Sequence, residues 1–340
     1  MVLEAVHFLW AFEPLGMCWV SVGYLLGIWQ ILNRYTIQKY GAVWYTAKEL
    51  YTARECGMGD RWNEKVCFIG GAGHSGSTLL GLVLGSHSQC FYAGEAIKTR
   101  YLQNPQANLR KRSCKFCGLD CPVWGNFVIS PAQDLYEQIS QQVHRSFIVD
   151  SSKNLDWIKE QVQQLQSLKV QIYFIFLKRD SRAVVSSRLR KYPDQSPESI
   201  IRDWRQQIQE TQNFFEQLTS AKISLHYEKF ATKPAIATQQ LCQFLGIEYE
   251  PEMLEYSKQA HHVLGGNNGT QFLVAKSQNL EHKPCSNLSN HNHDYYMQHY
   301  QNYGSQIQID LRWQKELSPA IQNLLESLGG SEYQLTKWEH

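Results

Sequence analysis

The sequence lacks an excess of charge of either sign. Its 340 residues include 33 Lys and Arg against 31 Asp and Glu, so the formal net charge is only +2. Because a protein that binds nucleic acid usually carries a clear basic excess, no nucleic acid is expected as a partner. Any affinity of this chain for anions must come from local clusters of basic side chains.

The sequence also lacks an N-terminal signal peptide and an internal repeat. Its nine cysteines are an odd number scattered along the chain, which does not indicate a disulfide scaffold. Hydrophobic residues make up 43% of the chain, which is enough to bury a full core. One α/β domain with additions fits this length better than two independent domains.

Residues 15–32 form an uncharged run with Trp19 and Trp29 near its ends. A bilayer span needs about 20 such residues, so the run is predicted either to cross a membrane or to pack as an apolar helix on the main domain or a partner. Basic residues follow the run, so a spanning helix would leave the main domain in the cytoplasm, anchored to the membrane. We assign residues 1–62 to this helix and a helical connector, and residues 63–340 to the main domain.

A glycine-rich segment follows the first predicted strand. Residues 65–80 read KVCFIGGAGHSGSTLL, an apolar run followed by a turn and a helix start. From Gly71 to Thr78 the spacing fits the phosphate-loop template G-x-x-x-x-G-K-[ST], except that Ser77 replaces the lysine. Hydrolysis of ATP or GTP is therefore not expected, because that lysine contacts the β- and γ-phosphates. Taken alone, the motif is equally consistent with a glycine-rich turn that binds nothing.

Polar side chains follow three further predicted strands. Glu95 comes after residues 89–93, Lys153 after residues 146–150, and a basic segment, residues 178–191, after the most hydrophobic strand, residues 170–177, which we expect at the centre of the sheet. Open α/β sheets bind ligands in the crevice at the carboxyl ends of their strands. The basic segment therefore predicts a second anion site, although a solvated glutamate, lysine or basic helix is the alternative in each case.

Three cysteines are spaced as C-x2-C-x3-C at Cys114, Cys117 and Cys121. They would need a fourth ligand from elsewhere to hold zinc, and no second C-x2-C or H-x3-H pair follows. The favoured interpretation is a structural hairpin, with one disulfide if the compartment is oxidising, so no metal site is predicted. Further along, residues 265–293 are predicted to form a loop rich in Asn, Ser and His.

With these motifs in place, the chain resembles sulfotransferases that use 3′-phosphoadenosine 5′-phosphosulfate (PAPS), over roughly residues 65–253. Residues 73–78 are similar to the loop that binds the 5′-phosphosulfate. Arg179 to Arg182, followed by Ser187, are similar to the motif that binds the 3′-phosphate. The cysteine segment and residues 262–267 look like features of bacterial sulfotransferases.

The tyrosylprotein branch of that family is similar at Glu95, the position of its catalytic base, and at Lys153, which contacts the sulfonate there. The chain departs from the family at His74, where Lys or Arg is usual. The resemblance implies catalytic roles for Glu95, Lys153 and His74, and donor contacts from Gly73, His74, Ser75, Gly76, Ser77, Thr78, Arg179, Ser187, Lys191 and Tyr227.

The resemblance implies a three-layer, P-loop-type α/β fold with a central parallel sheet flanked by helices. It also implies an enzyme that moves a sulfonate from PAPS, as co-substrate and without a metal, to a hydroxyl of a small-molecule, carbohydrate, lipid or peptide acceptor. The alternative is a kinase-like or catalytically silent nucleotide-binding protein, for which Asp150 is the best candidate Mg²⁺ ligand.

Overall fold

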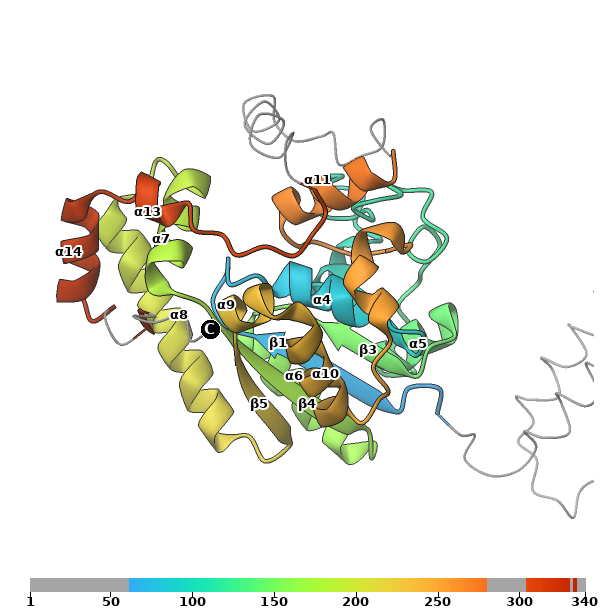
Figure 1. Ribbon diagram of the computed structural model, residues 1–340. Helices are drawn as coiled ribbons and strands as arrows, with labels where there is room; N and C mark the ends of the chain where they lie inside the picture. The colour runs from blue at the N-terminus through green and yellow to red at the C-terminus, as the bar shows by residue number, and fades with distance from the viewer. Residues whose placement is uncertain (1–60, 280–303, 331–332, 335–340) are drawn as a thin grey trace, which may run out of the picture. The chain divides into compact units, whose positions relative to one another are not determined.

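The computed structural model describes residues 61–279, 304–330 and 333–334. In this part of the chain, five parallel strands form one sheet in the order β2-β3-β1-β4-β5. They are β1 (Lys65–Gly70), β2 (Cys90–Gly94), β3 (Phe147–Asp150), β4 (Gln171–Lys178) and β5 (Ala221–His226). Helices lie on both faces of the sheet (Figure 1), so the predicted three-layer α/β fold is confirmed.

The middle position in the sheet belongs to β1, not to β4 as predicted. Lys65 of β1 lies opposite Phe147 of β3 on one side and Gln171 of β4 on the other. Both β1 and β4 have a neighbour on each side, and helices cover both faces. A strand in either place reads as a nearly continuous apolar run, so hydrophobicity alone does not separate the central strand from its neighbour.

The helices begin where the sequence supplies caps. Side chains of Asp134, Asn154, Asp180, Ser196 and Ser318 accept hydrogen bonds from backbone N–H groups in the first turns of five helices. The helical elements are α4 (Ser77–Gly85), η2 (Ala96–Tyr101), α5 (Leu135–Val143), α6 (Leu155–Ser167), α7 (Ser181–Lys191), α8 (Pro197–Gln217), α9 (Tyr227–Thr232), α10 (Pro234–Leu245), η3 (Pro251–Lys258), α11 (Asn268–Ser277), α13 (Trp313–Glu316) and α14 (Pro319–Ser327).

Helix α11 corrects the prediction of a loop over residues 265–293. Asn267 caps this helix by accepting a hydrogen bond from the backbone N–H of Thr270 at 3.0 Å. Gln271 and Val274 are buried on its inner face. The polar residues at the start of the segment suggested a loop, but Asn and Thr lie here at the cap of a helix. Residues 280–293 of the predicted loop lie outside the described residues.

The prediction of a membrane anchor also needs correction. No helix within residues 61–279, 304–330 and 333–334 is long and apolar enough to cross a bilayer. This finding does not support the localisation that we expected, a cytoplasmic protein that residues 15–32 could anchor to a membrane. Residues 15–32 themselves lie outside the described part of the chain.

Candidate active site

A cleft of about 1400 Å³ opens at the carboxyl ends of the strands. Each strand contributes a lining residue one to three positions beyond its last residue: Gly73 after β1, Glu95 after β2, Lys153 after β3, Arg179 after β4 and Tyr227 after β5. Parallel strands bring these ends to one edge of the sheet, where open α/β folds bind their ligands. Chain segments more than 150 residues apart thus meet around one space.

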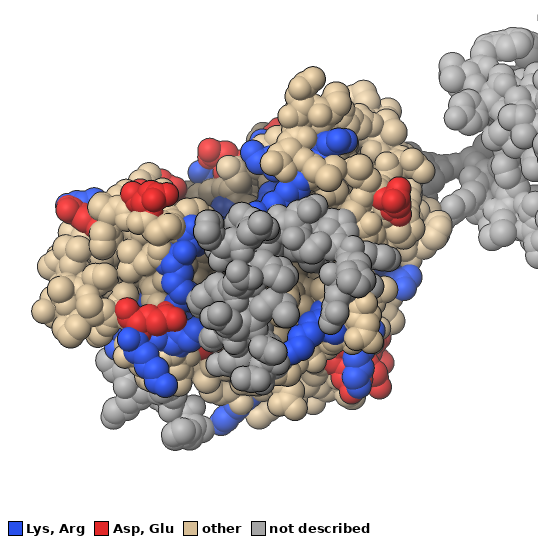
Figure 2. Space-filling view, turned by 90° about the horizontal axis from the view of Figure 1, so that it is seen from above, with Lys and Arg blue, Asp and Glu red and all other residues tan. Residues whose placement is uncertain are grey.

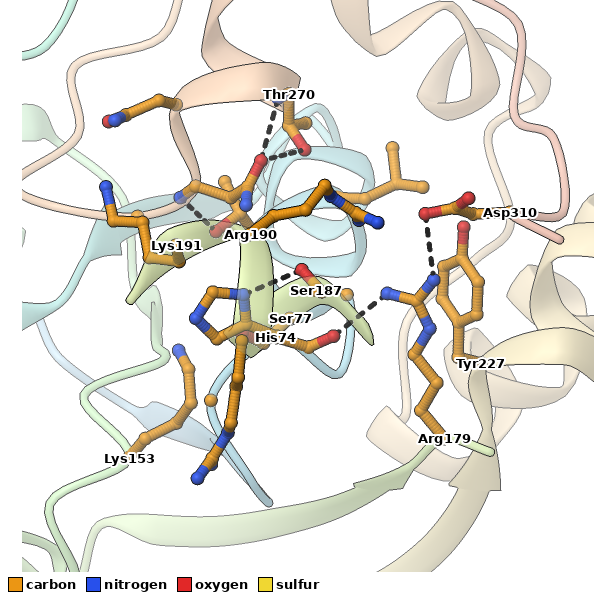
Figure 3. A pocket seen from close by; sticks show the side chains of 18 of the residues that line it. His74, Ser77, Lys153, Arg179, Ser187, Arg190, Lys191, Tyr227, Thr270 and Asp310 are labelled. Atoms are coloured by element: carbon orange, nitrogen blue, oxygen red, sulfur yellow. Dashed lines mark hydrogen bonds and ion pairs between the residues drawn. The ribbon is translucent and has the colours of Figure 1, made fainter. Parts of the chain in front are cut away.

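The cleft gathers nearly every residue that the sequence nominated. The lining includes Gly73, His74, Gly76, Ser77, Thr78, Glu95, Lys153, Arg179, Ser187, Lys191 and Tyr227. Ser75 is the exception, since it is only 1% exposed and its hydroxyl has no hydrogen-bond partner among the described residues. Figure 3 shows how the labelled side chains converge from separate elements.

Gly76 sets the shape of the loop between β1 and α4. It precedes the helix in a left-handed conformation, with φ of 93°, and has no side chain to cap the helix. A Cβ atom at this position would collide with the ring of Tyr227, so the loop and the start of α9 approach as closely as glycine allows. The first N–H groups of a helix have no intrahelical partner, so the start of α4 can bind an anion.

His74 lies in the middle of the loop and is neutral. Its Nδ1 lies 2.9 Å from Oγ of Ser187, which joins the loop to α7. Burial, together with the positive charges of Arg188, Arg179 and others, lowers the pKa of His74 to about 3. The imidazole can therefore donate a hydrogen bond to a sulfonate at neutral pH. The Lys or Arg that is usual at this position in the family that the chain resembles would instead supply a full charge.

Arg179 is held between three groups. One terminal nitrogen, Nη1, donates to the backbone carbonyl of His74 at 2.9 Å, and Nη2 pairs with Oδ2 of Asp310 at 3.1 Å (Figure 3). The guanidinium lies 4.4 Å from the ring centroid of Tyr227. Its Nε is buried and has no partner among the described residues. Arg179 thus connects the glycine-rich loop to β4 and α9 and keeps one donor unused.

Arg188 lies in the basic segment that predicts the second anion site, but the sequence interpretation did not assign it as a donor contact. Its Nη2 donates to Oε1 of Gln207 at 2.6 Å, and the same oxygen accepts a hydrogen bond from the backbone N–H of Gly73 at 3.0 Å. The Nε atom of Arg188 is buried without a partner in the described part of the chain. The sequence did hold a signal for this role. Arg188 lies three residues before Lys191, and this spacing puts both basic side chains on one face of a helix.

Glu95 and Lys153 also line the cleft. Oε1 of Glu95 accepts a hydrogen bond from the backbone N–H of Gly266 at 3.1 Å, and Oε2 pairs with Nζ of Lys98 at 2.8 Å. Burial raises the pKa of Glu95, but the charges of Lys153 and Lys98 outweigh it, so the pKa lies below the ordinary value. Burial lowers the pKa of Lys153, against the opposing charges of Glu95 and Asp150. Glu95 is therefore an ionised carboxylate at neutral pH.

Asp150 is a structural residue rather than an available metal ligand. It is fully buried, and its two oxygens accept hydrogen bonds from Ala96 N–H, Ser152 N–H and Oγ, the Tyr136 hydroxyl and Trp157 Nε1. These donors join the end of β3 to η2, α5 and α6. Because protein donors already surround the carboxylate, Asp150 cannot be the Mg²⁺ ligand that a kinase would require without rearrangement.

Basic side chains dominate the lining of the cleft. Among the described residues, eleven Lys and Arg line it against three Asp and Glu. Figure 2 shows several Lys and Arg side chains on the face of the molecule that is seen from above. The local positive field is therefore strong although the net charge of the whole chain is only +2.

Comparison with known proteins gives consistent matches. A family model described as Sulfotransferase family matches residues 67–251, more than half of the chain. A Caenorhabditis briggsae protein named "Putative protein-tyrosine sulfotransferase" is 24% identical over 225 residues, which cover 64% of this chain and 77% of that one.

Two solved structures are also similar. The first is a sulfotransferase domain from the curacin biosynthetic pathway, at 20% identity and a TM-score of 0.47, covering 81% of this chain and 100% of that one. The second is a sulfotransferase domain from the Synechococcus PCC 7002 olefin synthase, at 17% identity and a TM-score of 0.47, covering 81% of this chain and 97% of that one.

Proposed function

The chain belongs to the sulfotransferase family, and from this premise we propose which of its residues carry out the transfer. The protein is a transferase that moves a sulfonate group from PAPS, the general donor of the family, to an acceptor hydroxyl. We assign this activity to residues 63–340. The observation that carries the assignment of roles is that all five strand ends contribute a residue to one basic cleft.

The donor is proposed to bind along β1, β4 and the helices that follow them. Backbone N–H groups of Gly76, Ser77 and Thr78 would hold the 5′-phosphosulfate at the start of α4, and Tyr227 would contact the nucleotide from beneath the loop. Arg179, Ser187 and Lys191 would hold the 3′-phosphate, joined by Arg188, which lines the same cleft. Unused buried N–H groups on both arginines support this assignment, because a phosphate could satisfy them.

Glu95 is proposed as the general base. Its lowered pKa keeps it ionised, so it can take the proton of the acceptor hydroxyl as that oxygen attacks sulfur. The new oxygen–sulfur bond forms while the bond between sulfur and the phosphate oxygen breaks, and 3′-phosphoadenosine 5′-phosphate leaves. Lys153, a hydrogen bond from neutral His74 and the amides at the start of α4 would stabilise the charge that develops on the oxygens.

The acceptor is proposed to enter beside Glu95. The cleft, at about 1400 Å³, exceeds the roughly 300–1000 Å³ of a typical ligand site, which supports binding of a donor and an acceptor together. The name of the C. briggsae relative suggests a peptide tyrosine as the first hydroxyl to test. Carbohydrate, lipid and small-molecule hydroxyls are the other candidates, and the lysines around Glu95 would favour an acidic acceptor.

The kinase-like alternative is less well supported, because the loop has Ser77 in place of the usual lysine and the Asp150 carboxylate already accepts hydrogen bonds from several protein donors. The test incubates the purified protein with isotope-labelled PAPS, without added Mg²⁺, and a panel of tyrosine peptides, sugars, lipids and phenols. We expect label on one class of hydroxyl. Label transfer from ATP but not from PAPS would contradict the proposal.

A further inference from the structure

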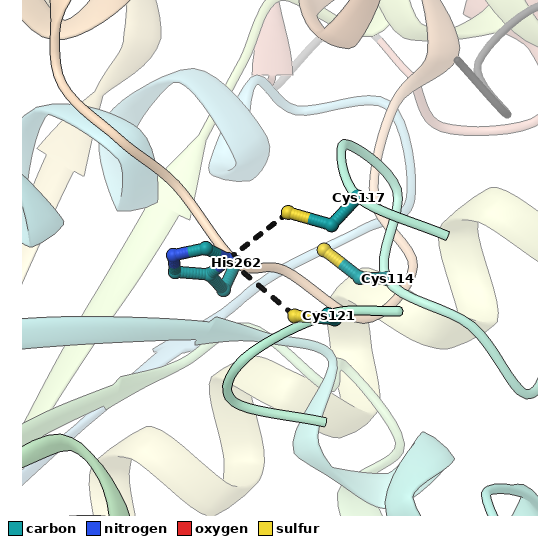
Figure 4. Close-up of side chains that lie close together, drawn as sticks. All are labelled: Cys114, Cys117, Cys121 and His262. Atoms are coloured by element: carbon teal, nitrogen blue, oxygen red, sulfur yellow. Dashed lines mark hydrogen bonds between the residues drawn. The ribbon is translucent and has the colours of Figure 1, made fainter. Parts of the chain in front are cut away.

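Three cysteines and one histidine meet outside the catalytic cleft. Sγ of Cys117 and Sγ of Cys121 lie 3.2 Å and 3.4 Å from Nδ1 of His262. The three sulfurs, that of Cys114 included, and this nitrogen all lie within 4.8 Å of one another (Figure 4). Cys114 and Cys121 are only 1% and 3% exposed. The cluster joins two segments that are 141 residues apart in the sequence.

The backbone holds the four side chains in this arrangement. Cys114 and Gly118 exchange backbone hydrogen bonds at 3.2 Å and 3.1 Å, and Gly118 has φ of 77°, which makes the tight turn between the first two cysteines and the third. The N–H of Lys115 donates to the carbonyl of Val263 at 3.0 Å, and the indole of Trp124 donates to the carbonyl of His262 at 2.7 Å. The histidine is therefore held against the cysteine turn by contacts that do not involve its own ring.

We propose that Cys114, Cys117, Cys121 and His262 form a structural zinc site. Tetrahedral zinc binds sulfur at about 2.3 Å and nitrogen at about 2.1 Å, which places ligand atoms about 3.5 to 3.8 Å apart. The observed distances between the ligand atoms, from 3.2 Å to at most 4.8 Å, bracket this range, so only small adjustments of the side chains are needed. Three thiolates and one imidazole complete a zinc site with no open position, which is typical of a structural rather than a catalytic ion. An iron–sulfur cluster would more often take four cysteines.

The site gives His262 a role that the sequence did not reveal. From the sequence, Cys114, Cys117 and Cys121 favoured a structural hairpin, with one disulfide if the compartment is oxidising, because no nearby pair could supply the missing ligand. A disulfide would use two of the three sulfurs and leave both the third sulfur and the imidazole beside it unexplained. The structure supplies the fourth ligand from a distant segment, so one metal ion accounts for all four side chains.

The zinc site also positions Glu95, an inference that rests on the proposed role of Glu95 as base. Two residues after His262, Leu264 donates to the carbonyl of Ala93 at 2.9 Å and accepts from the N–H of Glu95. Four residues after His262, Gly266 donates to the Glu95 carboxylate at 3.1 Å. The ion would thus fix the cysteine turn to the segment that orients the base, without touching substrate.

Metal analysis of the wild-type full chain tests the site directly. The protein is purified under reducing conditions, with any affinity tag removed, and its zinc and iron are measured by elemental analysis. We expect about one zinc per chain, and zinc X-ray absorption with three sulfur neighbours and one nitrogen neighbour. Protein that holds no zinc and takes up none when zinc is added to the reduced chain would overturn the proposal, as would a disulfide among these cysteines.

Two variants with matched controls locate the ion. Cys117→Ala and His262→Ala should each lose most of the bound zinc, whereas Cys242→Ala, at a buried position of α10, and His144→Asn, at the exposed end of α5, should keep it. Retention of zinc by both cluster variants would contradict the site. If the cluster variants do not fold, the metal content of the wild type and its X-ray absorption still decide the question.

Kinetics separate the positioning role from the metal itself. In His262→Ala we expect turnover to fall at least about tenfold while the affinity for 3′-phosphoadenosine 5′-phosphate stays within about threefold, because loss of a group that orients a functional residue typically costs about 10- to 100-fold. Equal losses of turnover and nucleotide affinity would show general damage and refute the positioning role. Failure of Glu95 as base would appear instead as normal turnover in Glu95→Gln with zinc still bound.

Discussion

The two ends of the cleft are built in different ways. At the proposed donor end, several functional groups follow their strands within a few residues, as His74 follows β1 and Arg179 follows β4. At the end that holds Glu95, the carboxylate accepts a hydrogen bond from Gly266, 171 residues away, in a segment whose Val263 carbonyl accepts from the N–H of Lys115 in the cysteine turn. The proposed donor residues are therefore identified by local motifs, whereas the orientation of the Glu95 carboxylate depends on a tertiary contact with Gly266.

This contrast predicts that variants at the two ends should affect different measured quantities. Changes at the base end should reduce turnover and leave donor affinity intact. Changes at the donor end should reduce nucleotide affinity or the stability of the loop. A variant that moves both quantities together would show that the two ends are coupled more tightly than their separate contacts indicate.

The largest effect is expected for Glu95→Gln. Loss of a positioned base should lower turnover by about 10²- to 10⁴-fold, while the affinity for 3′-phosphoadenosine 5′-phosphate, measured by calorimetry, stays nearly unchanged. Glu198→Gln is the matched control, because Glu198 lies on the surface of α8 and its side chain is 54% exposed. Near wild-type turnover in Glu95→Gln would remove Glu95 from the mechanism.

At the donor end, Arg179→Ala should weaken binding of 3′-phosphoadenosine 5′-phosphate by about 10- to 150-fold. A charge-assisted hydrogen bond contributes roughly 1.5–3 kcal/mol, and the variant also leaves Asp310 without one of its two arginine partners. The affinity for ADP, which has no 3′-phosphate, should change much less. Arg202→Ala, on the exposed face of α8, serves as the control. Equal losses of affinity for both nucleotides would mean that Arg179 does not bind the 3′-phosphate.

Gly76→Ala tests the loop without removing any functional side chain. The new Cβ would collide with the ring of Tyr227, and alanine disfavours a φ of 93°, so we expect a loss of about 1–3 kcal/mol in the free energy of unfolding. Gly304→Ala is the matched control, since the nearest atom to a Cβ there lies 4.0 Å away. Urea unfolding in the absence of nucleotide measures both variants. An equal effect of the two substitutions would contradict the close approach of loop and ring.

The same contrast explains which features could be predicted from the sequence. The strands and Lys153 could be predicted because a buried strand and the polar residue after it are adjacent in the chain. The partnership of Arg188 with Gln207 and of Cys121 with His262 could not, because each pair joins separate elements. Helix α11 was missed because its start is rich in cap residues that also favour loops. Local patterns identify the groups, and tertiary contacts decide their partners.

The smallest effect is expected for His74→Asn, and it concerns pH. The pKa of His74 in the folded protein is about 3, below its ordinary value of 6.5, because burial and the charge of Arg188 oppose protonation. Below pH 6.5 the histidine is therefore protonated in the unfolded chain but stays neutral in the folded chain. The free energy of unfolding consequently falls as the pH decreases. At pH 5.5 this group alone should cost about 1.4 kcal/mol relative to pH 7.5.

Asn fits the left-handed backbone of His74, where φ is 75°, and does not titrate, so His74→Asn should lack this part of the pH dependence. Urea unfolding at pH 7.5 and pH 5.5 compares the two proteins, with His144→Asn as the control at an exposed left-handed site. We expect the wild type and the control to lose about 1.4 kcal/mol more than His74→Asn over this range. If all three proteins lose the same stability, the loop histidine titrates normally in the folded protein. It would then be partly protonated at mildly acid pH, and donor binding should strengthen as the pH falls.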